Sequence, residues 1–102
     1  MDNEEKILSL MGLATRGRNL TSGEDQVLDA IRSGKAYLVV VASDASDNTK
    51  KLFNDKCTYY DVPVKIWGVR DKLGHAIGKE QRASLAITEA GFAKKLVTLM
   101  EE

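Results

Sequence analysis

The chain has 102 residues, of which 43% are hydrophobic and 29% are charged, and its acidic and basic side chains cancel to a net charge of zero. This length supports one domain with its own core, over 1–102, and the zero charge argues against a protein that coats nucleic acid through a basic excess. No apolar run approaches the roughly 20 residues of a membrane span, so no membrane partner is expected.

The first third of the chain alternates between helical and extended patterns. Apolar residues at helical spacing predict a helix over residues 3–15, with Gly17 as its stop. Residues 18–20 are compatible with an edge strand. A second helix is expected to begin near Ser22, whose hydroxyl would act as the cap with Asp25 three residues later. Its buried face carries Val27, Leu28, Ala30 and Ile31, and Gly34 ends it.

Gly23 at this helix start has a second interpretation. A residue without a side chain lets a ligand come close to the free N–H groups of a helix start, which favour phosphate.

The middle of the chain contains the clearest strand. Residues 37–42 are a continuous apolar, β-branched run, which is typical of a strand buried on both faces. A third helix is predicted over about 48–60, followed by a turn at 61–63 and a second buried strand at 64–67. The residues expected to face the core from the third helix are Leu52, Phe53, Cys57 and Tyr60.

A short helix follows, with Asp71 as its predicted N-cap. Leu73, Ala76 and Ile77 fall on one face, and Gly78 suits the helix end. Lys79 and Arg82 then lie on the exit loop before a strand at 83–88, and a last helix is expected over about 90–100.

Strands separated by helices from residue 37 onward imply right-handed crossovers and a parallel centre. With helices on both faces, the fold class is α/β, a three-layer α/β/α sandwich with a mixed sheet of about four strands.

Motifs for catalysis are absent from the sequence. It contains no phosphate loop, no Gly-x-Gly-x-x-Gly, no Gly-x-Ser-x-Gly and no Cys-x-x-Cys, and His75 is the only histidine. Cys57 is interpreted as a structural thiol, and Asp44 and Asp47 as helix caps rather than cation ligands. No catalytic residue, metal site or cofactor is therefore expected. The single cysteine and the acidic N-terminus, which lacks a signal-peptide pattern, predict a cytoplasmic location.

The run Leu73-Gly74-His75-Ala76-Ile77-Gly78-Lys79, followed by Arg82, resembles the signature loop of the ribosomal protein seven-Ae/thirty-e (L7Ae/L30e) superfamily, whose members bind kink-turn RNA. The segments 32–42, 43–51 and 55–63 resemble a small bacterial branch of it, so the resemblance covers nearly the whole chain. It implies the same sandwich fold and a non-enzymatic RNA-binding protein in or around the ribosome. Its implied partners are structured RNA and ribosomal proteins, and a monomer is expected.

The resemblance also implies where RNA would bind. In the family, RNA is held by the start of the second helix and by the loop leaving the short fourth helix. Because the first strand ends where the last begins, these elements would meet only if the two strands run antiparallel. RNA-binding relatives usually carry Asn or Lys at the position of Asp25 and Lys at that of Asp29. Leu73, Ala76 and Ile77 could form either an apolar shelf for RNA or part of the core. The RNA-binding residues that we predict are Arg16, Arg18, Ser22, Gly23, Glu24, Asp25, Gln26, Lys72, Leu73, Gly74, Gly78, Lys79 and Arg82.

Two other classes of function remain open on sequence alone. The same sandwich could serve as a protein–protein interaction module, with Trp67, Tyr59 and Tyr60 as its docking surface, and an exposed Trp67 would favour this alternative. A small nucleotide-binding or enzymatic α/β domain is the weaker hypothesis, because the phosphate-binding motifs are missing.

Overall fold

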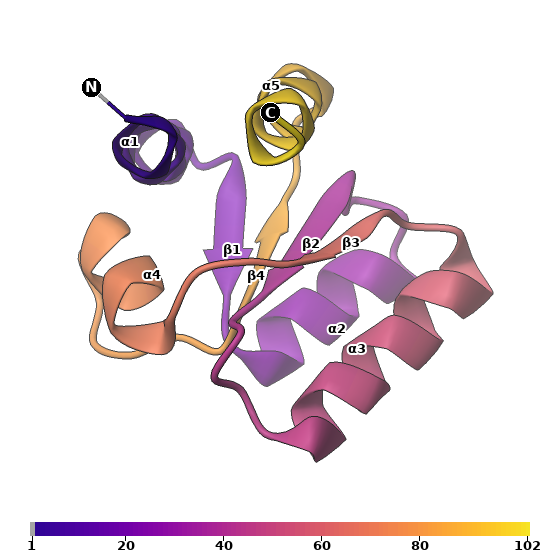
Figure 1. Cartoon of the computed structure of the whole chain (residues 1–102). Coiled ribbons are helices and arrows are strands. Elements are labelled where there is room, and N and C mark those ends of the chain that lie inside the picture. The colour runs from indigo at the N-terminus through magenta and orange to yellow at the C-terminus, as the bar shows by residue number, and fades with distance from the viewer. Residues whose placement is uncertain (1) are drawn as a thin grey trace.

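A mixed sheet of four strands forms the middle layer of the computed structural model, which describes residues 2–102 (Figure 1). Helices cover both of its faces, which confirms the predicted α/β class. In chain order the elements are α1 (Asn3–Arg16), β1 (Leu20–Ser22), α2 (Glu24–Arg32), β2 (Leu38–Val41), α3 (Asp47–Tyr60), β3 (Val64–Ile66), α4 (Arg70–Ala76), β4 (Ser84–Ile87) and α5 (Ala90–Met100).

The strand order is β1-β4-β2-β3, and β4 runs antiparallel to both of its neighbours. Only β2 and β3 are parallel, so the expected parallel centre is wrong. The reason is the path after β3, where the chain crosses to α4 on the β1 side of the molecule and re-enters the sheet from there (Figure 1). Strand β4 therefore begins beside the C-terminal ends of β1 and β2 and runs in the opposite direction between them.

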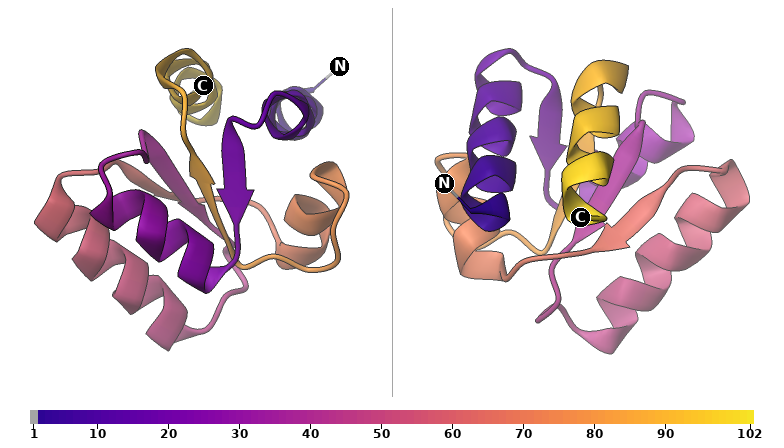
Figure 2. Two further views of the ribbon diagram at one scale, coloured as in Figure 1. Left: turned by 180° about the vertical axis from the view of Figure 1, so that it is seen from behind. Right: turned by 45° about the horizontal axis from the view of Figure 1, so that its top comes forward.

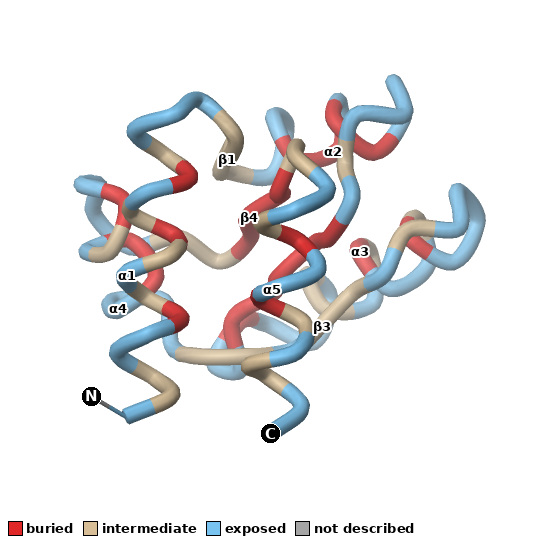
Figure 3. The backbone as a smooth tube through the Cα atoms, turned by 90° about the horizontal axis from the view of Figure 1, so that it is seen from above, coloured by how far each residue is buried: buried red, intermediate tan, exposed pale blue. Residues whose placement is uncertain are grey.

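The core lies on both faces of the two central strands. Every residue of β2 is fully buried, as are Leu85, Ala86 and Ile87 of β4, which confirms a buried strand within the apolar run at 37–42. Tyr37 lies outside the strand and is 50% exposed. Helices α1 and α5 pack on one face and α2 and α3 on the other (Figure 2). Figure 3 shows the buried residues along the inward sides of these elements and the exposed ones on the outer sides of the helices and along the loops. Large side chains such as Phe53 and Met11 fill the two helix–sheet layers, and burying each contributes about 1.5–3 kcal/mol.

The edge strand β3 and the end of α3 are more exposed than the sequence suggested. Ile66 is 50% exposed, so the predicted buried strand at 64–67 is an edge strand instead. Tyr60 was expected in the core but is exposed, and it forms an edge-to-face pair with Tyr59, which is 81% exposed. Trp67 is only partly accessible and packs against the core, which removes the feature that would have favoured a protein-docking surface there.

Three predicted helix caps are wrong. Asp47 is the first residue of α3, and the N-cap of that helix is Ser46, whose Oγ accepts the N–H of Thr49 at 3.1 Å. Asp71 lies inside the first turn of α4, whose N-cap residue is Val69 and makes no side-chain cap. The carboxylate of Asp44, from the β2–α3 loop, instead accepts the backbone N–H of Arg70 at 2.9 Å. Ser22 does not cap α2 either, because it is the last residue of β1, and the edge strand begins two residues later than the predicted 18–20.

Candidate nucleic-acid interface

The glycine corner, residues 22–26, joins β1 to α2. Gly23 has φ +94° and ψ +151°, a region of backbone space that is essentially restricted to glycine. A Cβ placed there would meet no atom within 4 Å, so the space in front of Gly23 is open. Glycine is therefore required for the backbone path and not for close packing within the protein.

The first turn of α2, which starts at this corner, combines uncapped backbone N–H groups with acidic side chains. No side chain caps α2, so the first-turn N–H groups of Glu24, Asp25 and Gln26 receive no side-chain acceptor within residues 2–102. All three side chains are exposed. The carboxylates would repel phosphate, but they can accept hydrogen bonds from base N–H groups, and Gln26 can both donate and accept. This corner suits the edges of bases better than the phosphate backbone.

The basic loop, residues 77–83, leaves α4 and leads into β4. Its first part is a Schellman motif, in which the N–H of Gly78 donates to the His75 carbonyl at 3.1 Å and that of Lys79 to the Gly74 carbonyl at 2.9 Å. Gly78 has φ +74° with open space where a Cβ would stand, as predicted for a glycine at this helix end. The loop then turns back, and the N–H of Arg82 donates to the Arg70 carbonyl at 3.2 Å.

Two of the predicted RNA contacts are buried beneath this loop. A Cβ on Gly74 would lie only 1.6 Å from the carbonyl oxygen of Glu80, so Gly74 allows the loop to fold back onto α4. Leu73 is fully buried in the core and Ile77 nearly so. The expectation that Leu73 and Gly74 touch RNA is therefore wrong, and of the proposed apolar shelf only Ala76 is accessible. Leu73, Gly74 and Ile77 therefore support the loop by packing beneath it.

The glycine corner and the basic loop lie side by side. The N–H of Gly23 donates to the Ser84 carbonyl at 3.2 Å, and the Nε of Arg82 donates to Ser22 Oγ at 3.1 Å. Both contacts follow from the antiparallel β1–β4 pairing, in which Ser22 is opposite Leu85. The two elements meet only if β1 and β4 run antiparallel, and the structure confirms this arrangement.

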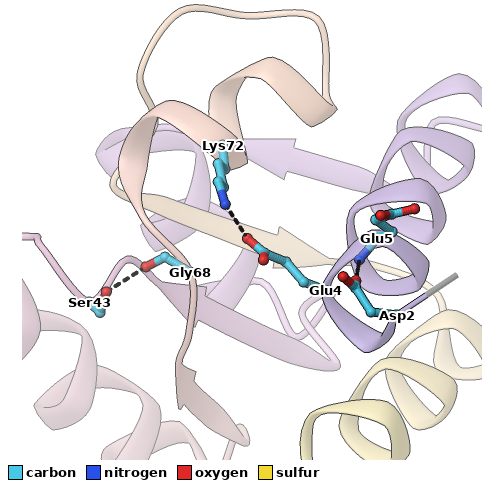
Figure 4. A network of polar contacts seen from close by, with 6 residues as sticks. All are labelled: Asp2, Glu4, Glu5, Ser43, Gly68 and Lys72. Carbon is cyan, nitrogen blue, oxygen red and sulfur yellow. Dashed lines mark hydrogen bonds and ion pairs between the residues drawn. The ribbon is translucent and has the colours of Figure 1, made fainter.

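Basic side chains are distributed unevenly around this surface. Lys79 and Arg82 have no carboxylate within 4 Å among residues 2–102. Lys72 donates to Glu4 on α1 at 2.7 Å, and this hydrogen bond raises the pKa of the lysine (Figure 4). Lys72 is therefore already paired, in contrast to its predicted role as a free phosphate contact.

Arg18 is predicted as a phosphate contact but lies at the wrong end of β1. Its neighbour Asn19 accepts the N–H of Thr88 at 2.9 Å, at the opposite end of the β1–β4 ladder from Gly23. Because β1 begins at Leu20, Arg18 precedes the strand, and the glycine corner follows it. Arg16, in contrast, shares a groove with the basic loop.

This α1–α4 groove was not predicted from the sequence. It runs between α1 and the α4 segment with its exit loop. Gly12 gave the available signal, because a glycine inside a helix often marks a close approach, and here its Cβ would lie 3.0 Å from the Ala76 carbonyl. The lining residues are Leu8, Ser9, Gly12, Leu13, Arg16, Asp71, Lys72, His75, Ala76, Lys79, Glu80, Gln81 and Arg82.

The loops behind the basic loop are held by polar contacts. Ser43 Oγ donates to the Gly68 carbonyl at 2.7 Å, which ties the β2–α3 loop to the segment before α4 (Figure 4). The hydrogen bond from the backbone N–H of Arg70 is the main cause that lowers the pKa of the Asp44 carboxyl from its usual 3.8. These contacts fix the start of α4 and therefore the position at which its exit loop begins.

Features of a catalytic centre are not found in the part of the chain that the structure describes. Burial raises the pKa of the Cys57 thiol to about 11, which disfavours the nucleophilic thiolate. Residues 2–102 contain no cluster of three histidine, cysteine or acidic side chains that could hold a metal ion. None of the helices in this range is long and apolar enough to cross a bilayer.

Comparison with known proteins identifies relatives over almost the whole chain. The sequence model of the "Ribosomal protein L7Ae/L30e/S12e/Gadd45 family" matches residues 5–97. The "RNA-binding protein YlxQ" of Bacillus subtilis (strain 168) is 50% identical over 90% of this chain and 92% of its own length. The "Large ribosomal subunit protein eL30" of Spodoptera frugiperda is 33% identical over 95% of this chain and 88% of its own. A protein of unknown function from Bacillus halodurans C has a solved structure that superposes with a TM-score of 0.92 and 48% identity, covering 95% of this chain and 98% of that one.

Proposed function

Because the chain belongs to the ribosomal protein L7Ae/L30e/S12e/Gadd45 family, we propose that it is a non-enzymatic protein that binds a kink-turn-like structured RNA. The observation that carries this proposal is the contact between the glycine corner and the basic loop through Arg82 and Ser22. A relative at 50% identity is named as an RNA-binding protein, which supports the same class of ligand.

The chemistry of the two elements suits a sharply bent RNA. Such an RNA exposes base edges and brings phosphates close together at the bend, and proteins read it by shape, base edges and backbone contacts. Glu24, Asp25 and Gln26 would accept from the N–H groups of exposed bases at the glycine corner. Lys79 and Arg82 would contact phosphates on the adjacent strand. The absence of a large basic excess fits recognition of a particular shape over coating of any duplex.

The test compares a kink-turn RNA with a fully paired duplex of the same length, by fluorescence anisotropy at fixed salt. We expect the wild-type protein to prefer the kink-turn RNA by at least about tenfold, which corresponds to about 1.4 kcal/mol. Equal affinities for the two RNAs would contradict the proposal.

Two glycine variants provide the matched comparison for this test. Gly23→Ala should weaken kink-turn binding by about tenfold or more, since it strains the corner and adds a methyl group on the open side. Gly34→Ala is the control, because Gly34 also has positive φ and open space around its Cβ position but follows the other end of α2. It should lower the melting temperature while leaving RNA affinity within about twofold of wild type. Similar losses of affinity in both variants would point to a general effect of destabilisation.

We also propose that the RNA belongs to the ribosome or to a particle that assembles on it, with a cytoplasmic location and ribosomal proteins as neighbours. The support is the relative from Spodoptera frugiperda, which is named as a large ribosomal subunit protein. Sedimentation of cell extracts through sucrose gradients tests this. The protein should migrate with ribosomal particles in the wild type and return to the top of the gradient in Gly23→Ala but not in Gly34→Ala.

A further inference from the structure

The α1–α4 groove lies beside the proposed kink-turn surface and has not been given a role. It has a volume of about 1290 Å³, above the usual 300–1,000 Å³ of a small-molecule pocket, and it is open to solvent. Helix α1 forms one wall, and α4 with the basic loop forms the other, as the neighbouring positions of the two helices in Figure 2 indicate. The size and openness of the groove leave room for a segment of a larger molecule.

The walls of the groove combine apolar and cationic side chains. Leu13 is 49% exposed, and with Leu8 and Ala76 it lines the apolar part. Arg16 and Lys79 also line the groove, and neither has a carboxylate within 4 Å in residues 2–102.

The remaining charges in the groove do not cancel these cations. Asp71 and Glu80 contribute two carboxylates, whereas Arg16, Lys79 and Arg82 contribute three cations, and Lys72 is neutralised by Glu4. The ion pair between Lys72 and Glu4 joins α4 to the first turn of α1 (Figure 4). Arg16 is in the last turn of the same helix and Lys79 follows the end of α4, whereas Arg82 lies beside the start of α4, where its N–H donates to the Arg70 carbonyl.

Arg82 connects the groove to the glycine corner. Its side chain lines the groove, and its Nε donates to Ser22 Oγ. A nucleic-acid strand bound at the glycine corner could thus pass over Arg82 and enter the groove without leaving the protein surface. This continuity favours RNA over a peptide as the occupant.

We propose that the α1–α4 groove binds unpaired nucleotides that extend from the bent RNA element, which is an inference that rests on the proposed function. Arg16 and Lys79 contact the phosphates of this single strand, and Leu13 with Leu8 packs against its bases. Contacts of this kind tolerate most sequences, because every base has an apolar face. The groove would therefore distinguish single-stranded from paired flanking RNA, but it would not distinguish one base sequence from another.

The test measures the gain in affinity that a single-stranded extension provides. Kink-turn RNA with blunt ends is compared with the same RNA carrying a four-nucleotide unpaired extension at its 5′ or 3′ end. Wild-type protein should bind one of the extended RNAs about five- to tenfold more tightly than the blunt RNA. The double variant Leu13→Asn, Arg16→Gln should bind the blunt and the extended RNA with equal affinity, because the groove no longer holds the extension.

Arg18→Gln is the matched control, because it removes a cation of the same kind from the far end of β1. It should keep the full gain from the extension. A gain that survives in the Leu13, Arg16 double variant, or one of equal size from a fully paired extension, would overturn the proposal.

The groove can also be tested without the bent element. The extension is added as a free tetranucleotide, and backbone amide chemical shifts are followed by NMR. Changes at Leu13 and His75 would support the groove as the binding site even if blunt kink-turn RNA fails to bind, an outcome that would count against the proposed function alone. No change at these residues at millimolar tetranucleotide would overturn the inference.

Discussion

Gly74→Ala provides the sharpest test of how the basic loop is built. Within a helix, replacing glycine by alanine normally stabilises a protein by about 1 kcal/mol, because alanine has the higher helix propensity. The fold of this chain predicts the opposite sign. The new Cβ would lie 1.6 Å from the Glu80 carbonyl oxygen and 2.5 Å from its carbonyl carbon, and both are backbone atoms that cannot rotate away.

The geometry gives the size of the effect. The shortest ordinary van der Waals distance is 3.4 Å, whereas the new Cβ would lie 1.6 Å from the Glu80 oxygen. The Glu80 carbonyl must therefore move by about 1.8 Å, the difference between these two distances. Such overpacking typically costs about 1–3 kcal/mol. The same shift would pull Arg82 away from Ser22 and displace Lys79, and losing one charge-assisted contact to RNA corresponds to about 10- to 100-fold in affinity.

Two measurements check this prediction. Thermal or urea unfolding should show a lower stability for Gly74→Ala, and anisotropy should show weaker kink-turn binding. Gly91→Ala serves as the control, because that helical glycine lies in α5 and the atoms nearest its added Cβ belong to the carboxylate of Glu89, which caps the same helix. It can weaken that cap and so lower stability by about 0.5–2 kcal/mol, but it should leave RNA affinity nearly unchanged. A rise in the melting temperature of Gly74→Ala with unchanged RNA affinity would refute the proposed packing of the loop.

Two further predictions concern pH. The hydrogen bond from the Arg70 N–H lowers the pKa of Asp44, so its stabilising effect is present above pH 3.8 and disappears as the pH falls through the lowered pKa. The difference in melting temperature between wild type and Asp44→Ala should therefore be largest near neutral pH and shrink below pH 3.8. Burial raises the pKa of Cys57 from 9.0 to about 11, so the unfolded chain loses this proton first and folding stability falls as the pH rises between these values. The stability advantage of wild type over Cys57→Ala should decrease by about 3 kcal/mol across this interval in urea titrations, at 1.36 kcal/mol per pH unit, whereas a constant difference would contradict the assigned burial effect.

Much of the fold could be read from local patterns. The β-branched run of β2, the buried face of α2 and the span of α5 agree with the sequence-based prediction because they depend on neighbours a few residues away. The left-handed glycine after α4 was also predictable, since Gly78 closes a helix in the way that its neighbours require. The resemblance to the family then identified which two loops to examine.

Other features depended on contacts between distant segments. The local pattern points to Asp71, the nearest acid, as the N-cap of α4, but the carboxylate that accepts the N–H of Arg70 at the helix start comes from Asp44, 26 residues before Arg70. Arg16 and Arg18 look equivalent in the sequence, yet one lines the groove and the other lies at the far end of β1. No local pattern could have separated them.

The sequence alone determined which segments become helices and strands, where glycine allows a left-handed turn, and the family whose loops this chain carries. Only the tertiary structure decided that β4 enters the centre of the sheet antiparallel, and this direction is what brings Arg82 to Ser22. It also buried Leu73 and Gly74 and opened the α1–α4 groove. The physical reason is range: helix and strand patterns reflect interactions over a few residues, whereas strand direction, burial and groove formation depend on where the crossover after β3 brings distant parts of the chain together.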